Sequence, residues 1–284
     1  MFELLQYPFI QNAFFAGTVV AITAAVIGYL LLARGLTFAG HALSHIGFAG
    51  AAGAVLLGFD PLLGLLTFTI LSAVGIGVLG KELEERDITI GIILTAALGL
   101  GALFLSLYAG YAEQAYSILF GTIVGISRSD VLITVGLGLL VLGITAILFR
   151  PLLFSSIDPT VAESRGVPLR FLSVIFLILV ALTVSISVQV VGVLLIFTLL
   201  VGPAATAMRV AKSPGSAILM AIGLGLLYTW FGILLATITN LPVSFLIATL
   251  SFGLYLVVRL GFVFQPRNDL SESSSLPDTT HGPL

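Results

Sequence analysis

The sequence predicts an all-α membrane protein that crosses the bilayer many times. Of its 284 residues, 59% are hydrophobic and only 8% are charged, whereas a soluble domain carries about 25% charged residues. The mean hydropathy is +1.22. The charged residues stand in short breaks between apolar runs, and most runs reach the length of about 20 residues that a helix needs to cross a bilayer.

Nine apolar runs predict nine transmembrane helices, or eight if one run is re-entrant. A tenth apolar piece, residues 118–127, is too short to cross and predicts a re-entrant or interfacial half-helix. Residues 1–262 are expected to form the transmembrane domain, and residues 263–284, rich in serine, a disordered tail. Residues 1–8 lack the basic stretch of a cleaved signal peptide, so the first run should remain as a span. The nine runs are residues 9–33, 38–57, 62–80, 88–108, 131–149, 171–188, 190–210, 216–239 and 243–260.

The basic residues predict which way the chain faces. If the polar segment 150–170 is cytoplasmic, alternation of the spans puts ten of the eleven Lys and Arg residues on that side, with only Arg128 opposite. Cytoplasmic loops of membrane proteins carry such an excess of basic residues. We therefore expect a multi-pass protein of the inner or plasma membrane with a cytoplasmic C-terminus, surrounded by lipid.

Composition excludes several kinds of chemistry. The chain has no cysteine, so any metal must be held by nitrogen or oxygen. The formal net charge of −2 argues against a nucleic-acid partner. A glycine-rich phosphate loop ending in Gly-Lys-Ser/Thr is missing, so a separate chain would have to hydrolyse ATP if transport uses it.

Two histidines in the second run are the strongest candidates for a functional site. His41 and His45 are four residues apart, so a helix places them one above the other on one face. Two converging imidazoles suit a divalent transition metal. The alternative is that they only form hydrogen bonds with neighbouring helices, as polar side chains in membranes often do. The third histidine, His281, lies in the predicted tail.

Other mechanisms fit the sequence less well. A membrane zinc protease would need the H-E-x-x-H pattern, but Ala42 follows His41. Ser44 and His45 are adjacent on a helix and point in different directions, so they cannot form a catalytic pair. We expect no enzyme activity in this chain. A stand-alone ion carrier or channel stays open as an alternative, although ion-coupled carriers usually need buried carboxylates.

The polar segment after residue 150 could dock a partner. Asp158 can cap a short helix and Pro159 can occupy its first turn. A short helix in a cytoplasmic break can insert into a groove on another protein. An ordinary solvated loop is the alternative.

Three segments resemble the membrane subunits of bacterial zinc and manganese ABC importers, the ABC-3 family. Residues 40–50, GHALSHIGFAG, are similar to the family's G-D-x-[IL]-[AS]-H motif. Residues 158–169, DPTVAESRGVPL, look like its D-P-x-x-A-x-x-x-G-V segment. Residues 191–214, VGVLLIFTLLVGPAATAMRVAKSP, resemble its V-G-x-L-[IL] and P-A-A-T-A run.

The resemblance implies a type II ABC importer fold and a defined set of partners. The permease would work as a homodimer with two cytoplasmic ABC ATPase subunits and receive its ion from an external solute-binding protein. The ion would be a transported substrate, with no permanently bound cofactor. The loop that the family uses for coupling to the ATPase falls on Asp158, Pro159, Ala162, Glu163, Arg165 and Gly166.

The match also shows where this chain departs from its family. The metal-contacting histidine of the motif falls on His45, whereas the motif's aspartate falls on His41. An imidazole in place of a carboxylate favours zinc over Mn²⁺. Thr95 and Thr122 stand where some members have His and Asp, and together with Gln189 and Pro203 they are candidate pathway residues. A permease for a metal chelate, such as haem or a siderophore, is a further alternative.

Overall fold

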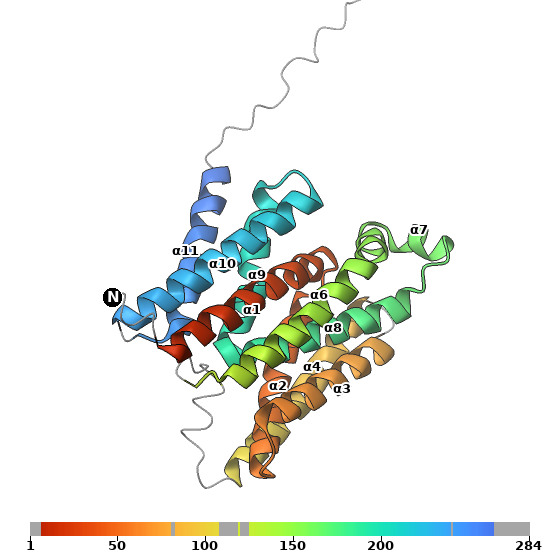
Figure 1. Cartoon of the computed structure of the whole chain (residues 1–284). Helices are drawn as coiled ribbons and strands as arrows, with labels where there is room; N and C mark the ends of the chain where they lie inside the picture. Colours follow the sequence, from red (N-terminus) through yellow and green to blue (C-terminus); the bar gives the residue numbers. More distant parts are fainter. Residues whose placement is uncertain (1–6, 81–82, 108–118, 120–124, 240, 264–284) are drawn as a thin grey trace, which may run out of the picture.

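The computed structural model describes residues 7–80, 83–107, 119, 125–239 and 241–263, and these fold into helices without any strand. The predicted all-α fold is therefore confirmed. Figure 1 shows the long helices packed side by side as a bundle. The helices are α1 Pro8–Ala33, α2 Thr37–Leu56, α3 Pro61–Leu79, α4 Leu83–Ser106, α6 Arg128–Ile157, α7 Pro159–Ser164, α8 Leu169–Val191, α9 Val193–Val210, α10 Pro214–Thr239 and α11 Val243–Val263.

Each of the nine predicted spans corresponds to one long helix, and eight of these are long and apolar enough to cross a membrane. The expectation of eight or nine spans is thus confirmed. The exception is α2, whose 20 residues include both histidines and four glycines. Most of the predicted half-helix at 118–127, including Thr122, lies outside the described residues. All of the predicted tail at 263–284 except residue 263 lies outside them as well.

One boundary differs from the sequence prediction. The fifth span was expected to end at residue 149, before a polar loop, but α6 continues through Pro151 to Ile157. The residues that follow the proline are mainly apolar, and Leu152 is completely buried. Burial of this apolar turn against the bundle outweighs the loss of one backbone hydrogen bond at the proline.

The centre of the bundle is formed by α1 and α8, which are the most buried of the spans. In Figure 1, α1 and α8 run between the group α2, α3 and α4 on one side and the group α9, α10 and α11 on the other. The histidine helix α2 packs against α3, α4, α8 and α9. The helix that carries the candidate metal ligands is therefore enclosed by other helices.

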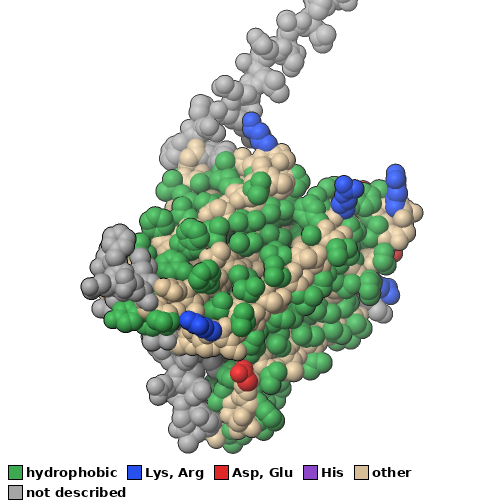
Figure 2. All heavy atoms as spheres, viewed as in Figure 1, with side chains coloured by type: hydrophobic (Ala, Val, Ile, Leu, Met, Phe, Trp, Pro, Cys, Tyr) green, Lys and Arg blue, Asp and Glu red, His purple; other side chains and the backbone are tan. Residues whose placement is uncertain are grey.

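The outer face of the bundle is apolar. Figure 2 shows hydrophobic side chains covering most of one face, with Lys and Arg side chains near its ends. Exposed leucines, isoleucines and phenylalanines occur on α3, α4, α6, α10 and α11. In water such a surface would aggregate, whereas in a bilayer it contacts lipid. The chain is a multi-pass membrane protein.

Glycines let α2 and α3 approach closely. A side chain at Gly50 would overlap the backbone carbonyl of Gly64, and a side chain at Gly64 would overlap that of Gly50. Small residues at such a crossing bring two backbones into contact. This contact fixes the position of α2, and with it the positions of the two histidines.

We expect Gly50→Ala to destabilise the protein by about 1–3 kcal/mol, because the added methyl group pushes α3 away from α2. The matched control is Gly91→Ala on α4, since a side chain at Gly91 meets no atom within 4 Å. Thermal unfolding of the purified protein in detergent measures both effects. Equal melting temperatures for the two variants would contradict the proposed role of this crossing.

Candidate metal-ion site

The two histidines lie next to each other on α2, as their spacing predicts. The chain enters α2 through a turn in which Gly35 has φ of 65°, a conformation that glycine adopts without strain. The ring centroids of His41 and His45 are 4.7 Å apart, and the rings are inclined by 74°. Both side chains are half-buried. One ion could therefore contact both imidazoles with only small rotations of the side chains.

The aromatic ring of Phe197 on α9 forms one wall of this site. Its centroid is 5.0 Å from that of His41, and the two rings meet edge to face. Such an edge-to-face contact helps to orient the imidazole. The site is thus built from α2 and α9.

The imidazole nitrogens are free to bind an ion. Neither histidine forms a hydrogen bond with any of the residues described by the structure, and their nitrogens are not among the fully buried polar atoms. The alternative considered from the sequence was that these histidines form hydrogen bonds with neighbouring helices. The described contacts do not include such bonds, so the lone pairs of both rings are available.

The site has few ligands. Within the described parts of the chain there is no group of three or more His, Cys, Asp or Glu residues that could hold a metal. A resident structural metal usually has four protein ligands. Two imidazole nitrogens alone would hold an ion weakly, so that it could leave the site again.

Ser44 satisfies its hydroxyl donor within its own helix. Its hydroxyl donates to the carbonyl of Gly40 at 2.9 Å, and the side chain is buried. Serine often satisfies its hydroxyl in this way within a helix. Ser44 is therefore a packing residue on α2.

A buried pair of hydroxyls beside α2 was missed by the sequence reasoning. Thr69 on α3 and Ser185 on α8 are hydrogen-bonded to each other at 2.9 Å. Thr69 also faces Gly47 of α2, because a side chain at Gly47 would meet its methyl group at 3.1 Å. The only signal was the alternation Ser185, Ser187, Gln189 near the end of α8, which does not reveal a partner on another helix.

The remaining pathway candidates are not joined to the histidines by any described contact. Thr95 lies on an exposed face of α4, and its hydroxyl donates to Gly91 of the same helix. Gln189 is half-buried near the end of α8, and its Oε1 is buried without a hydrogen-bond partner among the described residues. Pro203 is buried in α9, which stays helical from Val193 to Val210. Thr122 lies outside the described residues.

The segment predicted to couple to an ATPase forms a short, well-defined helix. The carboxylate of Asp158 accepts a hydrogen bond from the Val161 amide at 2.9 Å, and Pro159 is the first residue of α7. At the other end, the amides of Gly166 and Val167 donate to the carbonyls of Glu163 and Ala162, with φ of 80° at Gly166. This is a glycine-terminated helix end in which no other residue fits without strain.

The side chains of α7 divide into a buried and an exposed set. Ala162 is completely buried against the bundle. Glu163 and Arg165 are exposed, as is much of Val161. In Figure 1, α7 projects at the edge of the bundle, between α6 and α8. The arrangement presents a rigid, exposed helix to any partner on that side.

Comparison with known proteins extends the match to nearly the whole chain. The ABC 3 transport family matches residues 6–261. The manganese transport system membrane protein MntC of Listeria innocua is 32% identical over 271 residues, which is 94% of both chains. The manganese import system permease protein ScaB of Streptococcus parasanguinis is 32% identical over 255 residues, covering 89% of this chain and 91% of its relative.

A solved structure shows the same fold. A chain of PsaBC from Streptococcus pneumoniae, determined in complex with Fab, superimposes with a TM-score of 0.80 at 30% sequence identity. The match covers 90% of this chain and 92% of that chain. Because family, relatives and fold agree over almost the full length, this chain belongs to the ABC 3 transport family and is a permease subunit of a metal ABC importer.

Proposed function

We propose that the protein imports divalent transition-metal ions and that His41 and His45 contact the ion as it crosses. The observation that carries this proposal is the pair of adjacent imidazoles with free nitrogens, enclosed by helices of a membrane bundle. An ionisable side chain is expensive to keep in a bilayer unless it serves a function. The ion is a substrate, and the permease holds no permanent cofactor.

The proposed partners follow from the architecture of the family. An external solute-binding protein delivers the ion, and a separate cytoplasmic ABC ATPase supplies the energy. Two copies of the permease form the transporter in the cell membrane. The C-terminus is cytoplasmic, because that orientation puts nearly all basic residues inside.

Helix α7 is the proposed contact with the ATPase. Its exposed face includes Val161, Glu163 and Arg165, whereas Ala162 anchors it to the bundle. Both ends of α7 are capped, so a push on the exposed face is passed to α6 and α8 instead of unwinding the helix. A rigid connection of this kind is what transmission of ATPase closure requires.

Ligand chemistry favours zinc at the histidine pair. Imidazole nitrogens suit zinc and the later first-row metals, whereas Mn²⁺ prefers carboxylate and carbonyl oxygens. The names of the relatives MntC and ScaB refer to manganese. Position 41 carries histidine where the family motif has aspartate. This change of ligand could alter the preference between zinc and manganese.

We expect His45→Ala to reduce metal uptake by about tenfold or more, because loss of even an outer contact to a metal costs 10–100-fold in affinity. The matched control is Ser44→Ala, since Ser44 bonds only within its own helix. Uptake of radioactive zinc and manganese by cells expressing the permease with its ATPase and binding protein measures the effect. Unchanged uptake in His45→Ala, with normal membrane levels, would refute the site.

His41→Asp should shift the preference from zinc toward manganese, because it replaces a nitrogen ligand by a carboxylate. Competition between the two ions in the same uptake assay measures the ratio of their half-saturating concentrations. His41→Asn is the control, since it offers an oxygen ligand without the charge. If the ratio is the same in all three proteins, position 41 does not select the ion.

Asp158→Ala should uncouple ATP hydrolysis from transport, because loss of an N-cap costs about 1 kcal/mol and frays α7. Asp158→Asn keeps the cap and should stay close to the unmodified protein. The ratio of ions transported to ATP hydrolysed in reconstituted vesicles reports coupling. Equal ratios for the alanine and asparagine variants would argue against a role for the capped helix.

A further inference from the structure

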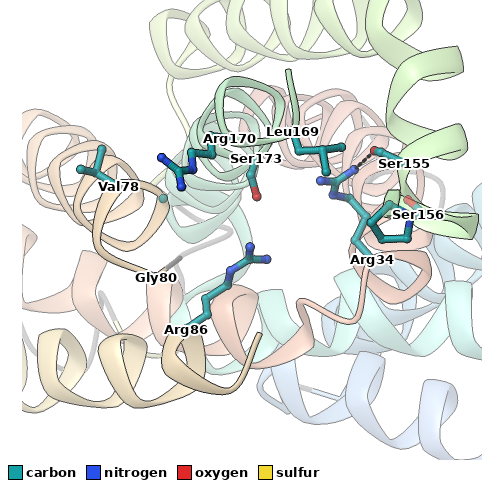
Figure 3. A pocket seen from close by; sticks show the side chains of 11 residues that line it. Arg34, Val78, Gly80, Arg86, Ser155, Ser156, Leu169, Arg170 and Ser173 are labelled. Carbon is teal, nitrogen blue, oxygen red and sulfur yellow. Dashed lines mark hydrogen bonds between the residues drawn. The ribbon is translucent and has the colours of Figure 1, made fainter. Parts of the chain in front are cut away.

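A cavity of about 320 Å³ lies at the end of the bundle where α7 projects. It is bounded by Arg34, which directly follows α1, by the ends of α3 and α6, by Pro159 of α7, and by residues in the first turns of α4 and α8. Figure 3 shows that the guanidinium groups of Arg34, Arg86 and Arg170 surround this space, together with the hydroxyl of Ser173. The cavity is separate from the histidine pair, which does not line it.

Arg34 is fixed at one wall of the cavity. Its Nη1 donates hydrogen bonds to the carbonyl of Leu152 at 3.1 Å and to the hydroxyl of Ser155 at 2.8 Å. The guanidinium carbon lies 5.3 Å from the ring centroid of Phe176. These contacts orient the group, but none of them neutralises its charge.

The positive charge of the cavity is only partly balanced among the described residues, because Asp87 acts on Arg86 from outside the cavity lining. No described Asp or Glu lines the cavity, and the buried Nε atoms of Arg34 and Arg86 have no hydrogen-bond partner within the described chain. Burial and the nearby charge of Arg86 lower the pKa of Arg34 to about 10. Asp87, the residue after Arg86, is exposed and does not reach the cavity lining.

Like charges that line one half-buried cavity are stabilised by an anion, and Arg34 and Arg86 are half-buried whereas Arg170 is exposed. Removing two guanidinium groups from water is unfavourable unless an opposite charge with good hydrogen-bond geometry compensates. The planar fork of arginine matches the oxygens of a phosphate group and binds two of them at once. Ser173 adds a hydroxyl that makes no hydrogen bond with any described residue. The described lining of the cavity thus offers hydrogen-bond donors for an oxyanion and includes no carboxylate that would compete with it.

The surface of α3 next to the cavity is apolar and suits the acyl chains of a lipid. On α3, Leu71, Val74 and Val78 are exposed at helical spacing, and Val78 also lines the cavity. An apolar stripe therefore leads along the outside of the bundle directly to the three arginines. A phospholipid matches both parts, with its acyl chains on the stripe and its phosphate in the cavity, whereas free phosphate or a carboxylate of a partner protein matches only the second.

We propose that this cavity binds the phosphate group of an anionic phospholipid, held by Arg34, Arg86 and Arg170. The lipid would fill the gap between α3, α4 and α8 beside α7. Basic pockets between transmembrane helices bind anionic head groups in this way. The site stabilises the end of the bundle from which α7 projects.

Native mass spectrometry of the full-length protein in detergent tests the proposal. Phosphatidylglycerol and phosphatidylcholine with the same acyl chains are titrated separately. The double variant Arg86→Gln/Arg170→Gln should retain phosphatidylglycerol about tenfold less well than the unmodified protein. Arg34 is left intact, because its bonds to Leu152 and Ser155 also hold α6 in place.

The matched control is Arg150→Gln/Lys212→Gln, which removes two exposed positive charges that do not line the cavity. It should retain phosphatidylglycerol within about twofold of the unmodified protein, because general attraction to the membrane is spread over many basic residues. The unmodified protein should also prefer phosphatidylglycerol over phosphatidylcholine. Equal losses in the two double variants would overturn the assignment to the cavity.

Two further measurements identify the source of the anion. If inorganic phosphate alone saturates the unmodified protein and displaces the lipid, the site takes free phosphate and the lipid proposal is wrong. If Arg86→Gln/Arg170→Gln loses its ATPase in co-purification but keeps its lipid, the arginines serve a carboxylate of the partner. Each of these two results overturns the proposal.

Discussion

Two imidazoles without hydrogen-bond partners among the described residues can exist in a bilayer only if other helices enclose them, and the rest of the fold provides that enclosure. Lipid offers no partner for a polar group, so a polar helix must be surrounded by protein. Helix α2 packs against α3, α4, α8 and α9. The contact of the Gly50 and Gly64 backbones fixes one side of α2, and Phe197 fixes the ring of His41 from another.

The other polar groups near α2, unlike the imidazoles, form hydrogen bonds within the protein. The hydroxyls of Ser44 and Thr69 donate to carbonyls of their own helices, and Thr69 also pairs with Ser185. These groups need nothing from an ion. The imidazoles differ because their nitrogens have no hydrogen-bond partner among the described residues, and the proposal that they contact a metal ion is based on this contrast.

The end of the bundle near α7 carries a cluster of positive charge. Helix α7 is capped by Asp158 and followed by a turn at Gly166, and it stands beside a cavity that three arginines line. A phosphate in that cavity would join the ends of α3, α4 and α8, the last of which follows α7 in the chain. Lipid binding and coupling to the ATPase would then act on the same group of helix ends, although they depend on different residues.

Sequence alone determined the all-α class, the nine long helices, the placement of His41 and His45 side by side on one helix face, and the cap of α7 by Asp158. These features depend on local rules of span length, helical periodicity and capping, which act within one stretch of chain. The continuation of α6 through Pro151 escaped sequence reasoning because burial of Leu152 decides it. Only the tertiary structure decided three features. These are the lack of hydrogen-bond partners for the imidazoles among the described residues, the Thr69–Ser185 pair, and the lining of one cavity by Arg34, Arg86 and Arg170. Each depends on which residues distant in the chain are brought together, and no local pattern contains that information.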